Sequence, residues 1–290
     1  MLLLHIQRLK YSFMQKLDIH LLILIASSIF LSSCATASLS RNKGIGRIKE
    51  YHIASKDLPP EFNGFRIAFA TDFHYESRFS RKHLPSLINA LKSLNADILL
   101  LGGDYRGRNG GDVNELFAAL SSIKTRYGTY AVMGNHEREE NDTLARKAMN
   151  ETGVRLLEHS TDTIHKGKSF ILITGIRNPF DLKNNGISPT LSAAPKDFVI
   201  MLTHTPDYAE DTDISNTDLV LAGHTHGGQI SFFNRWTPAK FSKYGNRFLT
   251  GKKYNSAGIP IIISNGLGTS RRDIRLFTPS EIVLIVLEIL

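Results

Sequence analysis

The chain has 290 residues, of which 42% are hydrophobic, enough to bury one large core or two small ones. Its net charge of +8 comes without a dense basic tract, so nucleic-acid binding is not indicated, and a phosphate-bearing substrate or an anionic membrane surface accounts for the excess equally well. The single cysteine, Cys34, excludes an intramolecular disulfide framework and a metal site built from thiolates.

The first 33 residues have the composition of a secretory signal or of a membrane anchor. Residues 21–33 are mostly apolar and uncharged, and three basic residues precede them. Small residues immediately before Cys34 resemble a bacterial lipobox, whose cysteine is lipidated after cleavage. This apolar run is short for a membrane span, which needs about 20 residues. We therefore expect a lipoprotein signal over residues 1–33 with lipidation of Cys34, and an uncleaved anchor is the alternative.

These two interpretations predict different locations. Lipidation of Cys34 would hold the following residues outside the cytoplasmic membrane, whereas an anchor also allows an inner-membrane protein that faces the cytoplasm. Ala35 is not the aspartate associated with inner-membrane retention, which favours the outer membrane of a two-membrane bacterium for the lipoprotein. Residues 36–45 are rich in small and polar side chains, so we expect a tether over 34–45 and a folded domain over 46–290.

Strands and helices alternate in the first half of the folded domain. Weak alternation over 47–55 predicts an edge strand, and apolar residues spaced three and four apart predict a helix over 82–94. Asp112 and Glu115 have the spacing of a helix-capping pair, and a third helix is expected over 142–152. With the intervening apolar strands, this β-α-β-α-β-α order predicts an α/β domain with a parallel sheet and crossover helices.

The second half of the domain has a different character. Short strands are expected over 154–158, 163–165 and 170–175, and further strands over 260–264 and 282–290. The final run contains a glutamate and is too short to cross a membrane, so we interpret it as a closing strand.

Aromatic and basic residues interleave between residues 231 and 258. This composition suits a rim that dips toward anionic lipid headgroups. It also suits a loop that packs over the second sheet, which is the interpretation that we favour.

Five apolar runs end in side chains that can bind metal ions. Near-continuous apolar runs are typical of strands buried on both faces, and open α/β sheets place ligand sites beyond the carboxyl ends of their strands. The residues at the five ends are Asp72 and His74, Asp104, Asn135 and His136, His204, and His224 and His226. In an extended segment His224 and His226 would point to the same side, and flanking glycines allow a ligand to approach the backbone. Imidazole and oxygen ligands together predict a metal site.

The order of these residues resembles the signature of calcineurin-like metallophosphoesterases. The matching motifs are D-x-H at 72–74, G-D at 103–104, G-N-H-E at 134–137, the single His204 and G-H-T-H at 223–226. The resemblance covers about residues 45–290, and the G-H-T-H-G-G-Q form is similar to a membrane-associated bacterial phosphodiesterase branch. It implies a catalytic domain folded as a four-layer α/β/β/α sandwich of two facing mixed sheets, with a dinuclear metal site at the C-terminal ends of strands.

The same resemblance implies a role for each residue. One divalent metal ion is held by Asp72, His74 and His226, a second by Asn135, His204 and His224, and Asp104 bridges the two. A metal-bridging hydroxide attacks a phosphodiester or a pyrophosphate, and His136 is the general acid. The substrate is expected to be linked to a membrane lipid, and the metals to be Mn, Fe, Zn or Co. Arg106, Arg108 and Arg138 follow ligand-bearing turns and are expected to contact substrate phosphate.

Alternatives of several classes stay open at this point. Some members of the branch hydrolyse UDP-2,3-diacylglucosamine, so a pyrophosphatase of lipid A biosynthesis is one alternative. A non-catalytic scaffold on the same fold is another, although it would be expected to lack ligands, and none is missing from these motifs. Another H-x-H metallohydrolase, such as an amidohydrolase, would carry that motif on an early strand, whereas here it comes last. The sequence leaves the metals, the ester type, the substrate, cleavage of the N-terminal segment and the oligomeric state open.

Overall fold

The computed structural model describes residues 45–107, 112–139, 143–177, 179–180, 187–232, 236–239 and 241–290. The chain divides after Arg41, and all described residues belong to the second unit, Asn42–Leu290. The predictions for residues 1–33, for Cys34 and for the tether up to residue 44 lie outside the described residues. Ile45, the last residue of the predicted tether, is buried in a hydrophobic core of this unit.

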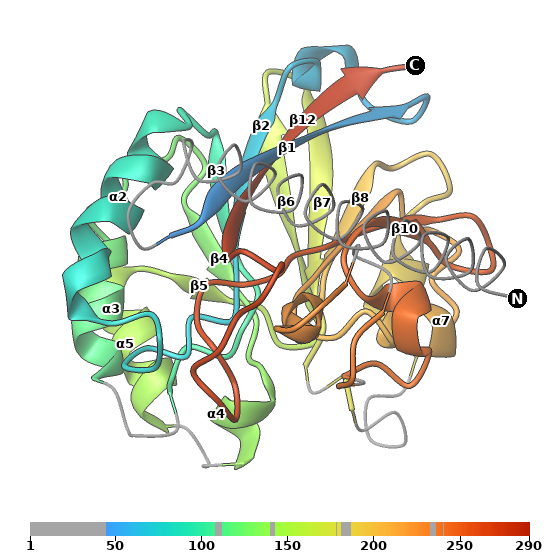
Figure 1. Cartoon of the computed structure of the whole chain (residues 1–290). Coiled ribbons are helices and arrows are strands. Elements are labelled where there is room, and N and C mark those ends of the chain that lie inside the picture. Colours follow the sequence, from blue (N-terminus) through green and yellow to red (C-terminus); the bar gives the residue numbers. More distant parts are fainter. Residues whose placement is uncertain are drawn as a thin grey trace, which may run out of the picture. The chain divides into compact units, whose positions relative to one another are not determined.

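Within the described residues, the strands form two six-stranded sheets (Figure 1). The first has the order β1-β12-β2-β3-β4-β5, with the bounds Arg47–Ser55, Glu281–Ile289, Arg66–Ala70, Ile98–Leu101, Thr129–Ala131 and Arg155–Leu156. The second has the order β10-β11-β9-β8-β7-β6, with the bounds Gly251–Tyr254, Pro260–Ile263, Leu219–Ala222, Val199–Leu202, Ser169–Gly175 and Ser160–Lys166. Both sheets are mixed, because β12 runs antiparallel to β2, and β10 and β6 run antiparallel to their neighbours.

Helices connect the parallel strands, as the order of elements predicts. Their bounds are α2 Leu84–Ser93, α3 Val113–Leu120, α4 Asn135–Glu139, α5 Thr143–Thr152 and α7 Tyr208–Asp211. Short 3-10 turns are η1 Pro60–Phe62, η2 Arg81–His83, η3 Pro189–Ser192, η4 His226–Gly228 and η5 Gly245–Phe248. Asp112 caps α3 by accepting a hydrogen bond from the Asn114 amide at 2.9 Å. None of the helices among the described residues combines the length and the apolar composition needed to cross a bilayer.

Three hydrophobic clusters show how the layers stack. Because side chains alternate along a strand, each sheet contributes to a cluster on either face. On β2, Phe69 packs in the cluster between the two sheets, whereas Ala70 packs with residues of α2, α3 and α5. On β8, Leu202 joins the cluster between the sheets, and Met201 packs with Tyr208 of α7. The layers are therefore α/β/β/α, and the predicted four-layer sandwich of two mixed sheets is confirmed.

The cluster between the sheets fixes the two sheets against each other. Each fully buried Ile, Leu or Phe side chain contributes about 1.5–3 kcal/mol relative to an exposed one. Its members include Ile67 of β2, Leu100 of β3, Ile200 of β8 and Leu221 of β9, all fully buried. These strands carry the predicted metal ligands at their ends, so this packing also sets the positions of the ligands.

Candidate metal centre

The ligand-bearing ends of five strands meet at one edge of the two sheets. Strands β2, β3 and β4 are parallel neighbours in the first sheet, and β8 and β9 are parallel neighbours in the second. Parallel neighbours present their C-terminal ends at the same edge, where open α/β sheets bind ligands. The residues that follow these strands are Asp72 and His74, Asp104, Asn135, His204, and His224 and His226.

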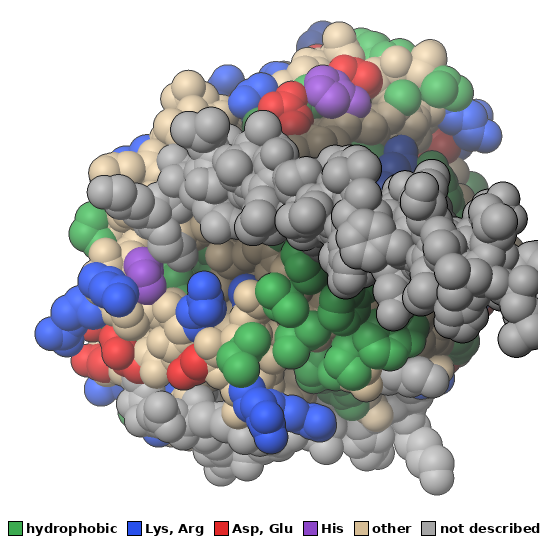
Figure 2. Space-filling model, viewed as in Figure 1, with side chains coloured by type: hydrophobic (Ala, Val, Ile, Leu, Met, Phe, Trp, Pro, Cys, Tyr) green, Lys and Arg blue, Asp and Glu red, His purple; other side chains and the backbone are tan. Residues whose placement is uncertain are grey.

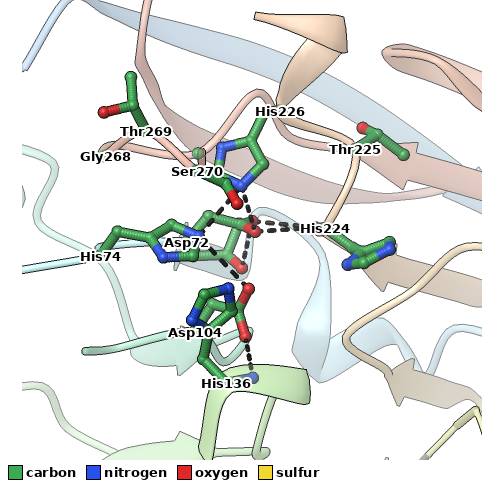
Figure 3. A network of polar contacts seen from close by, with 12 residues as sticks. Asp72, His74, Asp104, His136, His224, Thr225, His226, Gly268, Thr269 and Ser270 are labelled. Atoms are coloured by element: carbon green, nitrogen blue, oxygen red, sulfur yellow. Dashed lines mark hydrogen bonds and ion pairs between the residues drawn. The ribbon is translucent and has the colours of Figure 1, made fainter. Parts of the chain in front are cut away.

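Two groups of side chains lie close enough together to hold metal ions. The first consists of Asp72, His74, Asp104 and His226, and the second of Asp104, His204 and His224. Within each group the candidate ligand atoms lie within 4.8 Å of one another. Asp104 belongs to both groups. Its Oδ2 lies 3.3 Å from Nε2 of His74 (Figure 3). The same oxygen lies 3.3 Å from Nε2 of His204. The structure thus brings six of the seven predicted ligands into two groups with Asp104 in common.

The seventh predicted ligand, Asn135, begins α4 directly after Gly134. Its Oδ1 is buried and finds no hydrogen-bond partner among the described residues. A buried carbonyl oxygen without a partner costs free energy, and such an atom in a native site needs an explanation such as an ion. The backbone amide of the next residue, His136, donates to Oδ1 of Asp104 at 3.0 Å. This bond places the start of α4, and Asn135 with it, beside the shared carboxylate.

The backbone of the metal centre is strained. Positive φ angles occur at five of the seven predicted ligands: Asp72 (51°), His74 (38°), Asp104 (54°), His224 (69°) and His226 (52°). This conformation costs a residue other than glycine about 1–3 kcal/mol and clusters at functional sites. The extended segment expected at His224 and His226 is therefore wrong. The chain turns at both residues, which assigns His226 to the first group and His224 to the second.

Two motif glycines let the backbone approach the carboxylates. A Cβ atom on Gly134 would lie 2.1 Å from Oδ1 of Asp104, and one on Gly223 would lie 2.2 Å from Oδ2 of Asp72. Both distances are far below van der Waals contact, so a side chain at either position would displace a predicted ligand.

Hydrogen bonds orient the side chains of the two groups. Asp72 accepts from Oγ1 of Thr71 at 2.8 Å and from the backbone amide of His224 at 3.0 Å. His204 donates from Nδ1 to the carbonyl oxygen of Gly102 at 2.7 Å, which orients the ring so that its Nε2 faces Oδ2 of Asp104 at 3.3 Å. The Nε2 atoms of His74 and His226 face each other at 3.1 Å, as they would around a common ligand.

The ionisation of these groups suits metal binding. Burial lowers the pKa of His224 to about 3, so this imidazole is neutral near pH 7. Burial acts in the same direction on His204, but the Asp104 carboxylate overrides it and raises the pKa of His204 to about 10. Burial alone would raise the pKa of Asp104, but the neighbouring His204 and His74 hold it well below its ordinary value. Asp104 is therefore ionised, and a divalent cation competes with protons for the imidazoles beside it.

The other predicted site residues differ in how far the structure describes them. His136 is half-buried, and its ring lies 4.6 Å from the ring of His74 at an interplanar angle of 83°, beside the first group. Arg106 is half-buried, and its backbone amide donates to Glu137 at 3.4 Å. Arg108 and the side chain of Arg138 lie outside the described residues. Proton donation by His136 and phosphate binding by the three arginines stay predictions.

Glu137 is the last residue of the G-N-H-E motif, and the structure shows a role for it that the motif alone does not explain. Its buried carboxylate accepts hydrogen bonds from the amides of Asp104 at 2.9 Å, Tyr105 at 2.7 Å and Gly134 at 2.8 Å. Burial, and then the Asp104 charge, raise the pKa of Glu137 to about 7. Glu137 therefore ties the turn that follows β3 to the turn that follows β4.

Arg275 is the residue of this site that no sequence signal indicates. Its guanidinium donates to the carbonyl oxygens of Asn265 at 2.7 Å, Gly268 at 3.1 Å and His226 at 3.3 Å. These bonds join the turn after β9, which carries His226, to the loop after β11. Arg275 has no spacing to a motif residue that would mark it, because its partners are mainly backbone carbonyl oxygens, besides Nδ1 of His226 at 3.4 Å.

Two aromatic rings border the centre. The ring of Phe180 lies 5.0 Å from that of His224, and Phe180 is exposed. The ring of Phe241 lies 6.0 Å from that of His226. Each group of candidate ligands therefore has an aromatic ring beside one of its histidines.

Comparisons with known proteins cover most of the chain. A family model described as calcineurin-like phosphoesterase matches residues 65–228, more than half of the 290 residues. The chain is 28% identical to an uncharacterized metallophosphoesterase of Campylobacter jejuni over 91% of this chain and 68% of that protein. It is 28% identical to one of Helicobacter pylori over 81% of this chain and 62% of that protein, so it spans less than two thirds of that relative. A solved dimetal phosphatase from Danio rerio is similar with a TM-score of 0.43 and 12% identity, over 72% of this chain and 90% of that chain. The residues that the family model matches include all seven predicted ligands.

Proposed function

Because this chain belongs to the calcineurin-like phosphoesterase family, we propose that its metal centre hydrolyses a phosphodiester or a pyrophosphate linked to a membrane lipid. Family membership makes the chain a hydrolase of phosphoric esters. The observation that carries the proposal is the Asp104 carboxylate, which belongs to both groups of candidate ligands. A carboxylate shared in this way can hold two cations close together, as metal-assisted attack on phosphorus requires.

The residues present fit a pair of divalent metal ions. One ion would be held by Asp72, His74 and His226, the other by Asn135, His204 and His224, with Asp104 common to both. The neutral His224, the orientation of His204 by Gly102 and the unpaired Oδ1 of Asn135 all favour ligation. When bound, the ions supply positive charge to phosphoryl oxygens and lower the pKa of water. Oxygen and nitrogen ligands suit Mn, Fe, Zn or Co.

His136 is the candidate proton donor to the leaving oxygen. Its backbone amide donates to Asp104, and this bond fixes the first turn of α4 beside the shared carboxylate. Its ring packs edge-on against the ring of His74 and is only half-buried, so it can reach a substrate that enters from solvent. Protonation at this position matters most when the leaving alkoxide is a strong base.

The aromatic rings beside the two groups of ligands support the lipid-linked substrate. Phe180 is exposed beside His224, and an exposed ring next to a cationic centre suits a substrate with both an apolar part and a phosphate.

Such a substrate requires access to a membrane. We propose that a lipid on Cys34 provides this access and holds the catalytic domain outside the cytoplasmic membrane. Labelling cells with a fatty-acid analogue tests this, and Cys34→Ala should lose the label. If neither protein is labelled and both run at full-length mass, an inward-facing anchor replaces the lipoprotein, and UDP-2,3-diacylglucosamine becomes the leading substrate.

The ester type is tested with a panel of substrates and a metal measurement on the same sample. The panel contains a phosphodiester, a phosphomonoester and a pyrophosphate, each offered with and without a lipid chain. We expect about two metal ions per chain and the highest kcat/KM for a lipid-linked diester or pyrophosphate. A preference for soluble monoesters, or full turnover in a sample without metal, would overturn the proposal.

A further inference from the structure

Five large hydrophobic side chains are exposed together on two paired segments. They are Phe232, Trp236, Ile274, Leu276 and Phe277, which we call the aromatic patch, and their exposed fractions lie between 38% and 55%. The ring of Phe232 lies 5.7 Å from the ring of Trp236 and 5.7 Å from that of Phe277. Figure 2 shows hydrophobic side chains gathered on the viewed face, over segments coloured orange to red in Figure 1. Exposed apolar residues are ordinary when scattered, but a contiguous group marks an interaction surface.

Hydrogen bonds to the turns of the metal centre fix the backbone of the segment that carries Ile274 and Leu276 of the aromatic patch. Ile274 and Leu276 flank Arg275, whose guanidinium points inward to the carbonyl oxygens of Asn265 and His226. Leu276 also donates its amide to the carbonyl oxygen of Gln229 at 2.8 Å and accepts from the Ser231 amide at 3.1 Å. These bonds fix the backbone on either side of Arg275, where Ile274 and Leu276 are exposed. Their exposure is therefore part of the fold.

Positive charge borders the aromatic patch. Arg271 and Arg272 are exposed and lie three and two residues before Ile274, and the guanidinium of Arg271 lies 5.8 Å from the ring of Phe241. Asp273, the acid in this segment, accepts a hydrogen bond from Oγ1 of Thr269 at 2.6 Å. Figure 2 shows basic side chains at the border of the hydrophobic group. Aromatic rings at headgroup level with neighbouring arginines are the composition by which proteins rest on anionic bilayers.

We propose that the aromatic patch docks the catalytic domain on the headgroup region of an anionic phospholipid bilayer. A second copy of this chain fits less well, because a symmetric contact through the patch would bring Arg271 and Arg272 near their own counterparts. Docking would also bring the metal centre to the lipid surface, since Leu276 is bonded to Gln229, three residues after His226. This last consequence rests on the proposed function, whereas the docking itself does not.

The single tryptophan of the chain makes the contact directly measurable, because Trp236 lies in the aromatic patch. The full chain is reconstituted in vesicles of phosphatidylcholine, with and without phosphatidylglycerol, whose acyl chains are brominated or unmodified. We expect brominated lipid to quench Trp236 emission, with more quenching when phosphatidylglycerol is present and less at high salt. Equal emission in brominated and unmodified vesicles of both compositions overturns the proposal. A change of emission with protein concentration, without quenching by lipid, means that a second copy covers the patch, and this overturns it as well.

Matched variants separate the patch from general effects of charge and apolarity. Arg271→Gln with Arg272→Gln should lose most of the quenching. The control, Lys82→Gln with Lys92→Gln, changes exposed lysines on η2 and α2, removes the same charge and should keep the quenching. Phe232→Ser should lose quenching, whereas Phe170→Ser, at the same 38% exposure on β7, should keep it. Equal losses in a variant and its control overturn the proposal.

Turnover of soluble bis(p-nitrophenyl) phosphate is measured on the same wild-type sample. Quenching without turnover contradicts the proposed function but not the docking. Turnover without quenching contradicts the docking but not the proposed function.

Discussion

Asp104 is the residue on which both groups of the metal centre converge. One of its carboxylate oxygens lies 3.3 Å from ring nitrogens of His74 and His204, and the other accepts the amide of His136 at 3.0 Å. Single residues in this site therefore serve two neighbours at once.

Asp104→Asn should be the most damaging change of a single predicted ligand. The amide keeps the shape of the side chain but removes the negative charge that both groups share, so both ions should be weakened together. Elemental analysis of the purified variant should find fewer than two ions per chain, with turnover lost. Asp213→Asn, at an exposed carboxylate, is the control and should keep both. A variant at Asp104 with two tightly held ions and normal turnover would show that this residue does not bridge them.

His136→Asn should keep the metal ions and lose rate by about 10²–10⁴-fold, if His136 acts as the general acid. The loss should be smaller for p-nitrophenyl esters than for alkyl esters, because a good leaving group needs no proton. His165→Asn changes an exposed histidine on β6 and serves as the control. An equal loss for good and poor leaving groups would argue against proton donation.

At the scale of elements, the site is built from the turns that follow strands, and two charged residues, the buried Glu137 and the half-buried Arg275, tie these turns in pairs. Glu137 joins the turns after β3 and β4, and Arg275 joins the turn after β9 to the loop after β11. Both bond mainly to backbone groups. Such bonds hold ligands in strained conformations that the local sequence alone would not adopt.

Glu137→Gln should destabilise the fold by about 1–3 kcal/mol, the cost of leaving buried amides without an acceptor. Oε2 accepts the amides of Asp104 and Gly134, and Oε1 accepts that of Tyr105, so a glutamine NH₂ group faces a donor in either orientation. Chemical denaturation measures the loss. Glu151→Gln, at an exposed position on α5, should leave the free energy of unfolding unchanged. Equal stability of the two variants would contradict this role of Glu137.

Arg275→Lys should weaken metal binding by about 10–100-fold, as is typical when a group that orients a ligand is lost. A lysine keeps the charge but cannot bond several carbonyl oxygens with a planar fork. Competition with a chelator measures the metal affinity. Arg126→Lys, at an exposed position, is the control and should bind metal like the wild type. Unchanged affinity in Arg275→Lys would mean that the turn of His226 is held in other ways.

At the scale of the whole molecule, the metal centre joins two sheets that share no hydrogen-bonded strands in the part of the chain that the structure describes. Asp72, His74 and Asp104 follow strands of the first sheet, whereas His204, His224 and His226 follow strands of the second. Each group of candidate ligands contains residues from both sheets. Metal binding should therefore stabilise the sandwich as a unit.

Removing the metal ions with a chelator should lower the thermal midpoint by about 5–10 °C. Ligand at a hundred times its Kd stabilises by about 2.7 kcal/mol, and a domain of this size shifts by about 2–4 °C per kcal/mol. Differential scanning calorimetry measures the shift, and added metal should restore it. Asp104→Asn should start lower and respond little to the chelator. A wild-type midpoint that the chelator does not move would show that the sheets are held by packing alone.

Much of the fold and of the candidate site follows from the sequence, because the relevant signals are local. Apolar runs predicted the ligand-bearing strands, capping and periodicity predicted α2, α3 and α5, and the residues after the strands supplied the ligand candidates. The four-layer arrangement came from the family resemblance, and the three clusters confirm it. These features need only the order of residues along short segments, which periodicity and motif spacing record directly.

The tertiary structure alone decided how distant segments meet. The position of β12 between β1 and β2 depends on pairing across more than two hundred residues, which no local pattern encodes. The positive φ angles at His224 and His226, and with them the assignment of these residues to different groups, depend on the turns packed around them. Arg275 acts on backbone atoms, which carry no sequence signal. The aromatic segment divides in the same way: Phe248 is buried and Trp236 is exposed, because burial depends on which face of a segment the rest of the fold covers.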